Sequence, residues 1–138
     1  MTGKVRVGVL GMAHDHLWTN LKDLLKREDA ELVGAADLAP QLRERFRERT
    51  DCAHTFEQWD ELLDKQAPDA VYAFGATATH AEVVESCAER GIHVMVEKPM
   101  AATLAQADRM LVAARKHKIH LMVNWPTAWS RSIRTAYR

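Results

Sequence analysis

Short runs of apolar residues alternate along the chain with segments in which apolar residues recur every three or four positions. Six runs have the features of buried strands, namely residues 5–10, 31–36, 53–56, 70–74, 93–97 and 119–123. The intervening segments have helical spacing, as in 17–25, or many charges after a favourable first-turn proline, as in 40–49. The pattern therefore predicts six strands that alternate with helices.

Residues at the helix boundaries support this prediction. Thr79 with Glu82 has the spacing of a capping box, in which a hydroxyl and a carboxyl satisfy the first free N–H groups of a helix. Thr103 with Gln106 repeats the spacing before the next predicted helix. Gly91 is a typical terminator, because glycine readily adopts the left-handed conformation that ends a helix.

Strands that alternate with helices imply right-handed crossovers and a parallel sheet that is covered on both faces. Six strands are also the full count of the doubly wound sheet that binds dinucleotides, with strand order 3-2-1-4-5-6. We therefore expect an α/β Rossmann fold as a dinucleotide-binding domain over residues 1–125. Residues 126–138 are expected to begin a segment that leads to a C-terminal substrate domain absent from this chain, with a helix opening within 129–138.

Composition narrows the class of protein. The 138 residues are 47% hydrophobic and 28% charged, as in folded domains, and 19 Lys and Arg balance 19 Asp and Glu. This balance lacks the basic footprint of a nucleic-acid-binding protein, and no apolar run approaches the roughly 18 residues of a membrane helix. Cys52 and Cys87 make no disulfide framework and are expected to be buried as small apolar residues. A cytoplasmic protein without nucleic-acid or membrane partners is expected.

In a doubly wound sheet, ligands bind beyond the carboxyl ends of the strands, so the residues that follow each strand are candidates. After the first strand, the dinucleotide fingerprint requires three glycines, but only Gly11 matches and Ala13 and His16 replace the others. The N–H groups and the positive end of the next helix still offer a phosphate site. An ordinary strand-to-helix turn is the alternative interpretation.

Asp37 follows the second strand, 26 residues beyond Gly11, where this fold places an acid that accepts hydrogen bonds from ribose hydroxyls. A carboxylate there repels a 2′-phosphate and so favours NAD, whereas nearby Arg43 leaves NADP open. The alternative role of Asp37 is a cap for the helix at Pro40. The other arginines of that helix are interpreted as a solvated face: Arg45, Arg47 and Arg49.

Three further groups are candidates for chemistry. Lys98 follows the fifth strand, and a cation beyond the carboxyl edge can orient a hydroxyl or stabilise negative charge on oxygen. His14 and His16 suggest a metal, but no carboxylate or cysteine at a suitable sequence spacing completes a known site, so no metal is expected. His80 lies near the same edge and either contacts ligand or caps its helix.

These residues resemble the N-terminal domain of the Gfo/Idh/MocA oxidoreductases over essentially the whole chain. The most specific match is Gly91-Ile92-His93-Val94-Met95-Val96-Glu97-Lys98-Pro99. Supporting matches, in order along the chain, are Val7-Gly8-Val9-Leu10-Gly11, Asp37 and Thr79-His80.

The resemblance implies a nicotinamide-dependent oxidoreductase that acts on a sugar, polyol or related small alcohol or carbonyl. It implies NAD as cofactor, with NADP possible, and Lys98 as the active-site lysine. The pyrophosphate would lie on Gly11 to Ala13, the adenosine ribose at Asp37 and the nicotinamide ribose at Glu97. The full set of implied cofactor contacts is Gly11, Met12, Ala13, His14, Asp37, Gly75, Ala76, Thr77, His80, Glu97, Lys98 and Asn124.

The sequence departs from the family pattern at Ala13 and His16, and at Gly75-Ala76-Thr77, where the family has Thr-Pro-Asn. From the resemblance we also expect this chain to lack the family's second domain, which carries the remaining acid/base residues and oligomer contacts. We therefore expect a truncated chain that binds cofactor but turns over substrate poorly or not at all, in an oligomeric state left open. The alternatives are a free-standing nucleotide-binding or regulatory module and an α/β domain that binds no dinucleotide.

Overall fold

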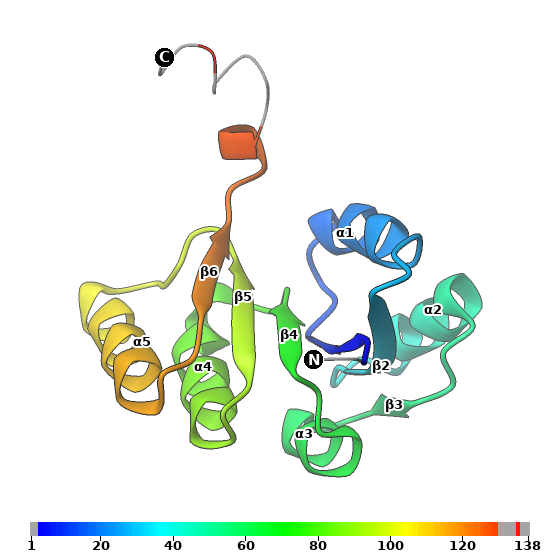
Figure 1. Ribbon diagram of the computed structural model, residues 1–138, viewed down its shortest axis with the longest axis horizontal. Coiled ribbons are helices and arrows are strands. Elements are labelled where there is room, and N and C mark those ends of the chain that lie inside the picture. The colour runs from blue at the N-terminus through cyan, green and yellow to red at the C-terminus, as the bar shows by residue number, and fades with distance from the viewer. Residues whose placement is uncertain (1–2, 130–134, 136–138) are drawn as a thin grey trace.

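The structure, a computed structural model, describes residues 3–129 and residue 135. A parallel sheet of six strands runs through the molecule in the order β3-β2-β1-β4-β5-β6 (Figure 1). This arrangement confirms the predicted doubly wound α/β fold and its strand order. The strands are β1 (Val5–Leu10), β2 (Ala30–Ala36), β3 (Thr55–Phe56), β4 (Ala70–Ala73), β5 (His93–Glu97) and β6 (Leu121–Asn124).

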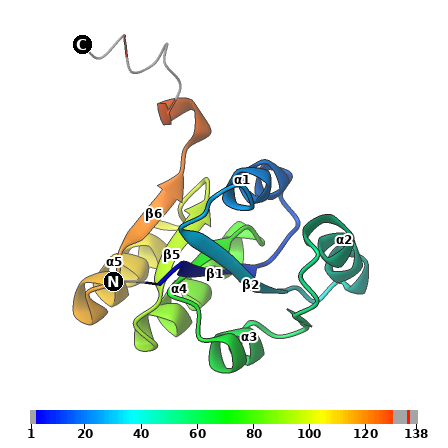
Figure 2. The same ribbon diagram turned by 45° about the vertical axis from the view of Figure 1, so that its right-hand side comes forward.

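Helices cover both faces of the sheet, as Figures 1 and 2 show. One face carries α1 (His16–Leu24) and α2 (Pro40–Thr50), and the other carries α3 (Trp59–Gln66), α4 (His80–Glu89) and α5 (Leu104–His117). Successive strand residues point to opposite faces, so β1 sends Val9 into one core and Leu10 into the other. This two-sided burial explains why the strands are continuous apolar runs rather than alternating ones.

The register of the strands brings most of their carboxyl ends to one edge of the sheet. Leu10 of β1 pairs with Ala36 of β2 and with Ala73 of β4. On the far side, Ala73 pairs with Val96 of β5, and Glu97 pairs with Asn124 of β6. The segments that follow β1, β2, β4, β5 and β6 therefore meet along a single edge, where this fold class binds its ligands.

The two predicted capping boxes have different outcomes. At α5, Thr103 Oγ1 accepts a hydrogen bond from Gln106 N, which confirms the first half of that prediction. The Gln106 side chain accepts from Ala102 N instead of Thr103 N. At α4 the prediction is wrong, because Thr79 ends the 3-10 turn η1 (Thr77–Thr79) and its hydroxyl donates to Ala76 O. The hydroxyl is thus used within the turn and does not cap the helix.

The arginines of α2 do not form a purely solvated face, which corrects the sequence interpretation. The guanidinium carbons of Arg45 and Arg49 lie 4.4 and 5.0 Å from the ring centroid of Trp18 on α1. Arg47 donates to Thr55 Oγ1 at the start of β3. Cation–π contacts of this kind join α1 to α2 across their shared face of the sheet.

After β6, residues Pro126–Trp129 form the 3-10 turn η2. The helix predicted to open within 129–138 lies mainly outside the described residues, and so does the segment expected to lead toward a second domain. Within the part of the chain that the structure describes, no helix is long and apolar enough to cross a membrane.

Candidate functional site

The turn after β1 touches the segment after β4 through two glycines. Gly11 has φ +76°, in the left-handed region that favours glycine, and a Cβ placed on it would lie 2.4 Å from Gly75 Cα. Phe74 N donates to Leu10 O, which holds the two segments in this contact. Glycine is therefore required at position 11 by both conformation and space.

The main chain beyond Gly11 offers hydrogen-bond donors along the edge of the sheet. Met12 N donates to Asp37 Oδ2 at 2.7 Å, and His14 N donates to Phe74 O at 3.3 Å. Among the described residues, the N–H groups of Ala13 and Asp15 have no partner within the chain. These free donors, next to the first turn of α1, fit the phosphate oxygens of a dinucleotide.

Asp37 connects the tip of β2 to this turn. Besides the bond from Met12, its Oδ1 accepts from Ala39 N at 2.9 Å. Ala39 is the N-cap residue of α2, so Asp37 stabilises the approach to that helix without being its cap. A carboxylate has about four lone pairs, so Asp37 can also accept from ribose hydroxyls. Arg43 Nη1 donates to Asp37 O and Leu38 O, which brings a positive charge to the same tip.

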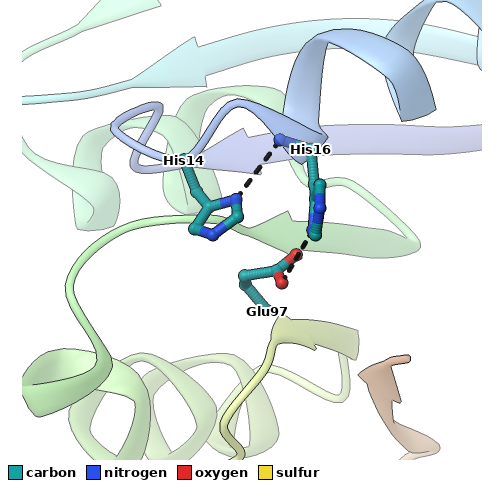
Figure 3. Close-up of side chains that lie close together, drawn as sticks. All are labelled: His14, His16 and Glu97. Atoms are coloured by element: carbon teal, nitrogen blue, oxygen red, sulfur yellow. Dashed lines mark hydrogen bonds and ion pairs between the residues drawn. The ribbon is translucent and has the colours of Figure 1, made fainter. Parts of the chain in front are cut away.

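A polar cluster lies between the turn after β1 and the tip of β5. His16, the first residue of α1, lies 3.0 Å from Glu97 Oε1 through its Nδ1 (Figure 3). Asn124 Nδ2 at the end of β6 donates to the other carboxylate oxygen at 2.8 Å. Lys98 Nζ lies farther away, 3.9 Å from Glu97 Oε1. Glu97 is thus the centre of a network that joins α1, β5 and β6.

Burial and hydrogen bonding have opposite effects on Glu97, whose side chain is 2% exposed. Burial alone raises its pKa, but the bonds from Asn124 and His16 and the nearby imidazoles outweigh this, so the pKa lies below its usual value. Glu97 is therefore an ionised carboxylate at neutral pH. Because a carboxylate only accepts hydrogen bonds, His16 Nδ1 carries the proton between them.

His16 takes the place of the third glycine of the fingerprint without blocking the packing of α1. That glycine normally allows a helix to lie close to the sheet. Here the His16 ring, 39% exposed, reaches sideways to Glu97 and does not enter the interface between α1 and the sheet. The core contacts of α1 come instead from Leu17, Leu21 and Leu24.

His80 is buried below the surface of the carboxyl edge of the sheet and is not exposed along that edge. Its ring is 1% exposed, and Nδ1 donates to Met100 O at 3.1 Å, just after the Lys98–Pro99 peptide. Nε2 is buried and has no hydrogen-bond partner among the described residues. His80 thus ties the start of α4 to the loop that presents Lys98. Of the other predicted contacts after β4, Gly75 and Thr77 are half-buried and Ala76 is exposed.

A pocket of about 220 Å³ lies beside this cluster, lined by His16, Thr19, Asn20, Asn124 and Pro126. Sequence analysis missed Thr19 and Asn20, although their place one turn after His16 could have indicated them. Asn20 Nδ2 donates to His16 O and supports the first turn of α1. Larger hollows of about 560 and 670 Å³ lie along α4 and α5 and at the amino edge of the sheet, away from these polar groups.

A doubly wound sheet with a glycine turn after β1, an acid after β2 and polar side chains after β5 defines the class of dinucleotide-binding domains. Comparison with known proteins shows which family of dinucleotide-binding domains this chain belongs to. Residues 5–125 match the model of the Gfo/Idh/MocA family, described as an oxidoreductase family with an NAD-binding Rossmann fold. The chain belongs to this family, as the sequence resemblance predicted.

Two relatives of the chain are named for a polyol or a nucleotide sugar. It is 27% identical to myo-inositol 2-dehydrogenase of Thermotoga maritima, over 94% of the chain and 39% of that protein. It is 33% identical to dTDP-3,4-didehydro-2,6-dideoxy-alpha-D-glucose 3-reductase of Actinomadura kijaniata, over 88% of the chain and 36% of that protein. The chain thus spans less than two fifths of the length of these relatives.

Solved structures agree with this assignment. A variant of a 3-ketoreductase from Actinomadura kijaniata, in complex with TDP-benzene and NADP, matches with a TM-score of 0.86 and 29% identity. The match covers 97% of this chain and 42% of that one. The fold of the whole described sheet is therefore shared with a dinucleotide-bound member of the class.

Proposed function

We propose that this chain is the cofactor-binding part of an oxidoreductase that transfers a hydride between nicotinamide and a sugar, polyol or related small alcohol or carbonyl. The observation that carries the proposal is the meeting, at one edge, of the Gly11–Gly75 turn with Glu97 and Lys98. Membership of the oxidoreductase family supports it, as do the polyol and sugar substrates named for the relatives.

The two ends of the cofactor have separate places in this proposal. The pyrophosphate would lie over Gly11 to Ala13, next to the free N–H groups of Ala13 and Asp15. The adenosine ribose lies at Asp37, whose carboxylate favours NAD, whereas the Arg43 guanidinium beside it can accept NADP. The nicotinamide half would be held by the remaining contacts, which are Gly75, Ala76, Thr77, Glu97 and Asn124.

The two side chains at the tip of β5, Glu97 and Lys98, have different proposed roles. A bound nicotinamide supplies the hydride acceptor or donor. Lys98 is the proposed catalytic residue, because its ammonium group can orient the substrate hydroxyl and stabilise the negative charge that develops on its oxygen. Glu97, buried and ionised, is proposed to accept from the nicotinamide ribose hydroxyls. His80 holds the following loop through Met100 O and so helps to position Lys98.

A titration of the chain with NADH and NADPH tests the proposal, with nicotinamide fluorescence and thermal unfolding followed together. A ligand at about 100 times its Kd stabilises the fold by about 2.7 kcal/mol, which a melting curve resolves. We expect saturable binding, tighter for NADH, and competition by ADP-ribose, which lacks the nicotinamide. Failure of both dinucleotides to bind or to stabilise the chain would reject the proposed cofactor site.

A further inference from the structure

The fold completes a cluster of metal-ligating side chains that sequence spacing does not show. His14 lies on the turn before α1 and His16 is the first residue of that helix, and Glu97, 81 positions after His16, joins them from the tip of β5 (Figure 3). Each residue offers one ligand atom, and these three atoms lie within 4.8 Å of one another. We propose that His14, His16 and Glu97 form a binding site for a divalent transition metal of the zinc class.

The donor set suits this kind of ion. Two imidazoles and one carboxylate are a common three-ligand set for zinc, which leaves a fourth position for water or a ligand. Ligand atoms around a tetrahedral zinc lie about 3.3 Å apart, as follows from metal–ligand distances of about 2.0–2.1 Å. His16 Nδ1 and Glu97 Oε1 are already 3.0 Å apart. Metal binding would require rotation of the partly exposed His14 side chain to close the remaining distance.

The hydrogen bonds around Glu97 fit a carboxylate that binds a metal through one oxygen and is oriented through the other. Asn124 Nδ2 donates to Glu97 Oε2, which leaves Oε1 directed toward the histidines. Such outer hydrogen bonds orient the carboxylates and imidazoles that bind metals. A metal would replace the proton between His16 and Glu97, and His14 would give up its bond from His16 N. Lys98 Nζ, 3.9 Å from Oε1, is the competing positive charge.

The chain contains a matched control for a simple histidine pair. His93 and His120 have ring centroids 4.8 Å apart, against 4.5 Å for His14 and His16. In both pairs a ring Nδ1 accepts from the backbone N–H of the partner histidine. Within the described residues, however, only the His14–His16 pair has a carboxylate close enough to complete a three-ligand group. A difference between the pairs therefore measures the contribution of the third ligand.

Calorimetric titration of the metal-free chain with zinc chloride tests the proposal, and the visible spectrum of added cobalt(II) reports the coordination geometry. We expect one zinc per chain and a cobalt spectrum of tetrahedral character. His16→Ala and Glu97→Gln should each weaken zinc binding tenfold or more. His93→Ala should change the affinity less than twofold. Because metal is the only ligand used, the outcome does not depend on dinucleotide binding.

Two results would overturn the proposal: zinc affinity that is unaltered in His16→Ala, or an equal loss in His93→Ala. Glu97 is buried, so the melting temperature of Glu97→Gln is measured alongside its affinity. If that variant unfolds, His14→Ala takes its place, since His14 is partly exposed and lies outside the core. Unchanged zinc binding by a folded His14→Ala would likewise contradict the assignment.

Discussion

The two halves of the sheet present different kinds of group at their shared carboxyl edge. The first half, after β1 and β2, presents main-chain N–H groups, and the carboxylate of Asp37 is bonded to the backbone at Met12 and Ala39. The second half, after β5 and β6, presents side chains that bond one another, namely Glu97 and Asn124. In the proposed function, the first half would hold the phosphates of the cofactor and the second would supply the side chains for the reaction.

This division follows from how each half reaches the edge. The turn after β1 enters α1 directly, so its backbone donors point outward before intrahelical bonds begin. After β5, by contrast, the chain leaves through Lys98 and Pro99 and begins α5 only at Leu104. The tip of β5 is therefore free to present side chains, and the substitutions below test each half separately.

Gly11→Ala should have the largest effect on stability, because it disrupts the contact between Gly11 and Gly75 that joins the two halves of the sheet. We expect the free energy of unfolding to fall by about 3–4 kcal/mol, since a left-handed alanine is strained and its Cβ would collide with Gly75. Chemical denaturation measures the loss. Gly91→Ala is the control, because Gly91 has φ +71° and nothing within 4 Å of an added Cβ. It should cost only about 1–2 kcal/mol, and equal losses would disprove the collision.

Lys98→Ala should reduce the catalytic function proposed for the second half and leave cofactor binding by the first half intact. In a two-domain enzyme that contains this chain, we expect turnover to fall about a hundredfold or more, because developing charge on the substrate oxygen loses its partner. The Kd for NADH should change little. Steady-state kinetics and fluorescence titration separate the two effects. Lys116→Ala, an exposed lysine of α5, is the control and should leave both unchanged. Unaltered turnover would make Lys98 an ordinary surface lysine.

Asp37→Ala should affect the first half and discriminate between cofactors. We expect NADH affinity to fall about tenfold through the lost hydrogen bonds to ribose, with a smaller loss for NADPH. Paired titrations of both dinucleotides measure the ratio. Asp108→Ala on α5 removes an exposed carboxylate away from the edge and should alter neither affinity. Equal losses for the two cofactors would contradict the placement of Asp37 at the ribose.

Sequence reasoning predicted the features that depend on local pattern. The apolar runs gave the strands, and their alternation with helices gave the parallel sheet and its order. Since parallel strands share one carboxyl edge, Asp37 and Lys98 could be placed together there before any contact was known, whereas Asn124 came from the family resemblance. The cap at Thr103 was also predictable from local pattern, because its partner Gln106 lies within one helical turn.

Features that depend on distant pairs could not be predicted in this way. The contact between His16 and Glu97 spans 81 positions and arises from the path of one turn and the register of one strand. The stacking of Arg45 on Trp18 depends on how α1 and α2 pack. Thr79 had the local spacing of a cap, but an alternative acceptor at Ala76 O took its hydroxyl. The partners of His16 and Arg45 are thus distant in sequence, whereas Thr79 has a nearby acceptor that competes with the expected cap.

The smallest effect expected is a difference in reactivity between the two cysteines, one in each half. Burial raises the pKa of Cys87 on α4 to about 12, and it raises that of the half-buried Cys52 as well. Since the thiolate is the reactive form, mild alkylation at pH 8 should label Cys52 slowly and leave Cys87 unlabelled until the chain unfolds. Mass spectrometry of digested samples locates the label, and Cys52→Ser should abolish it. Labelling of Cys87 at the rate of Cys52 would mean that α4 opens readily, against its dense packing on β4 and β5.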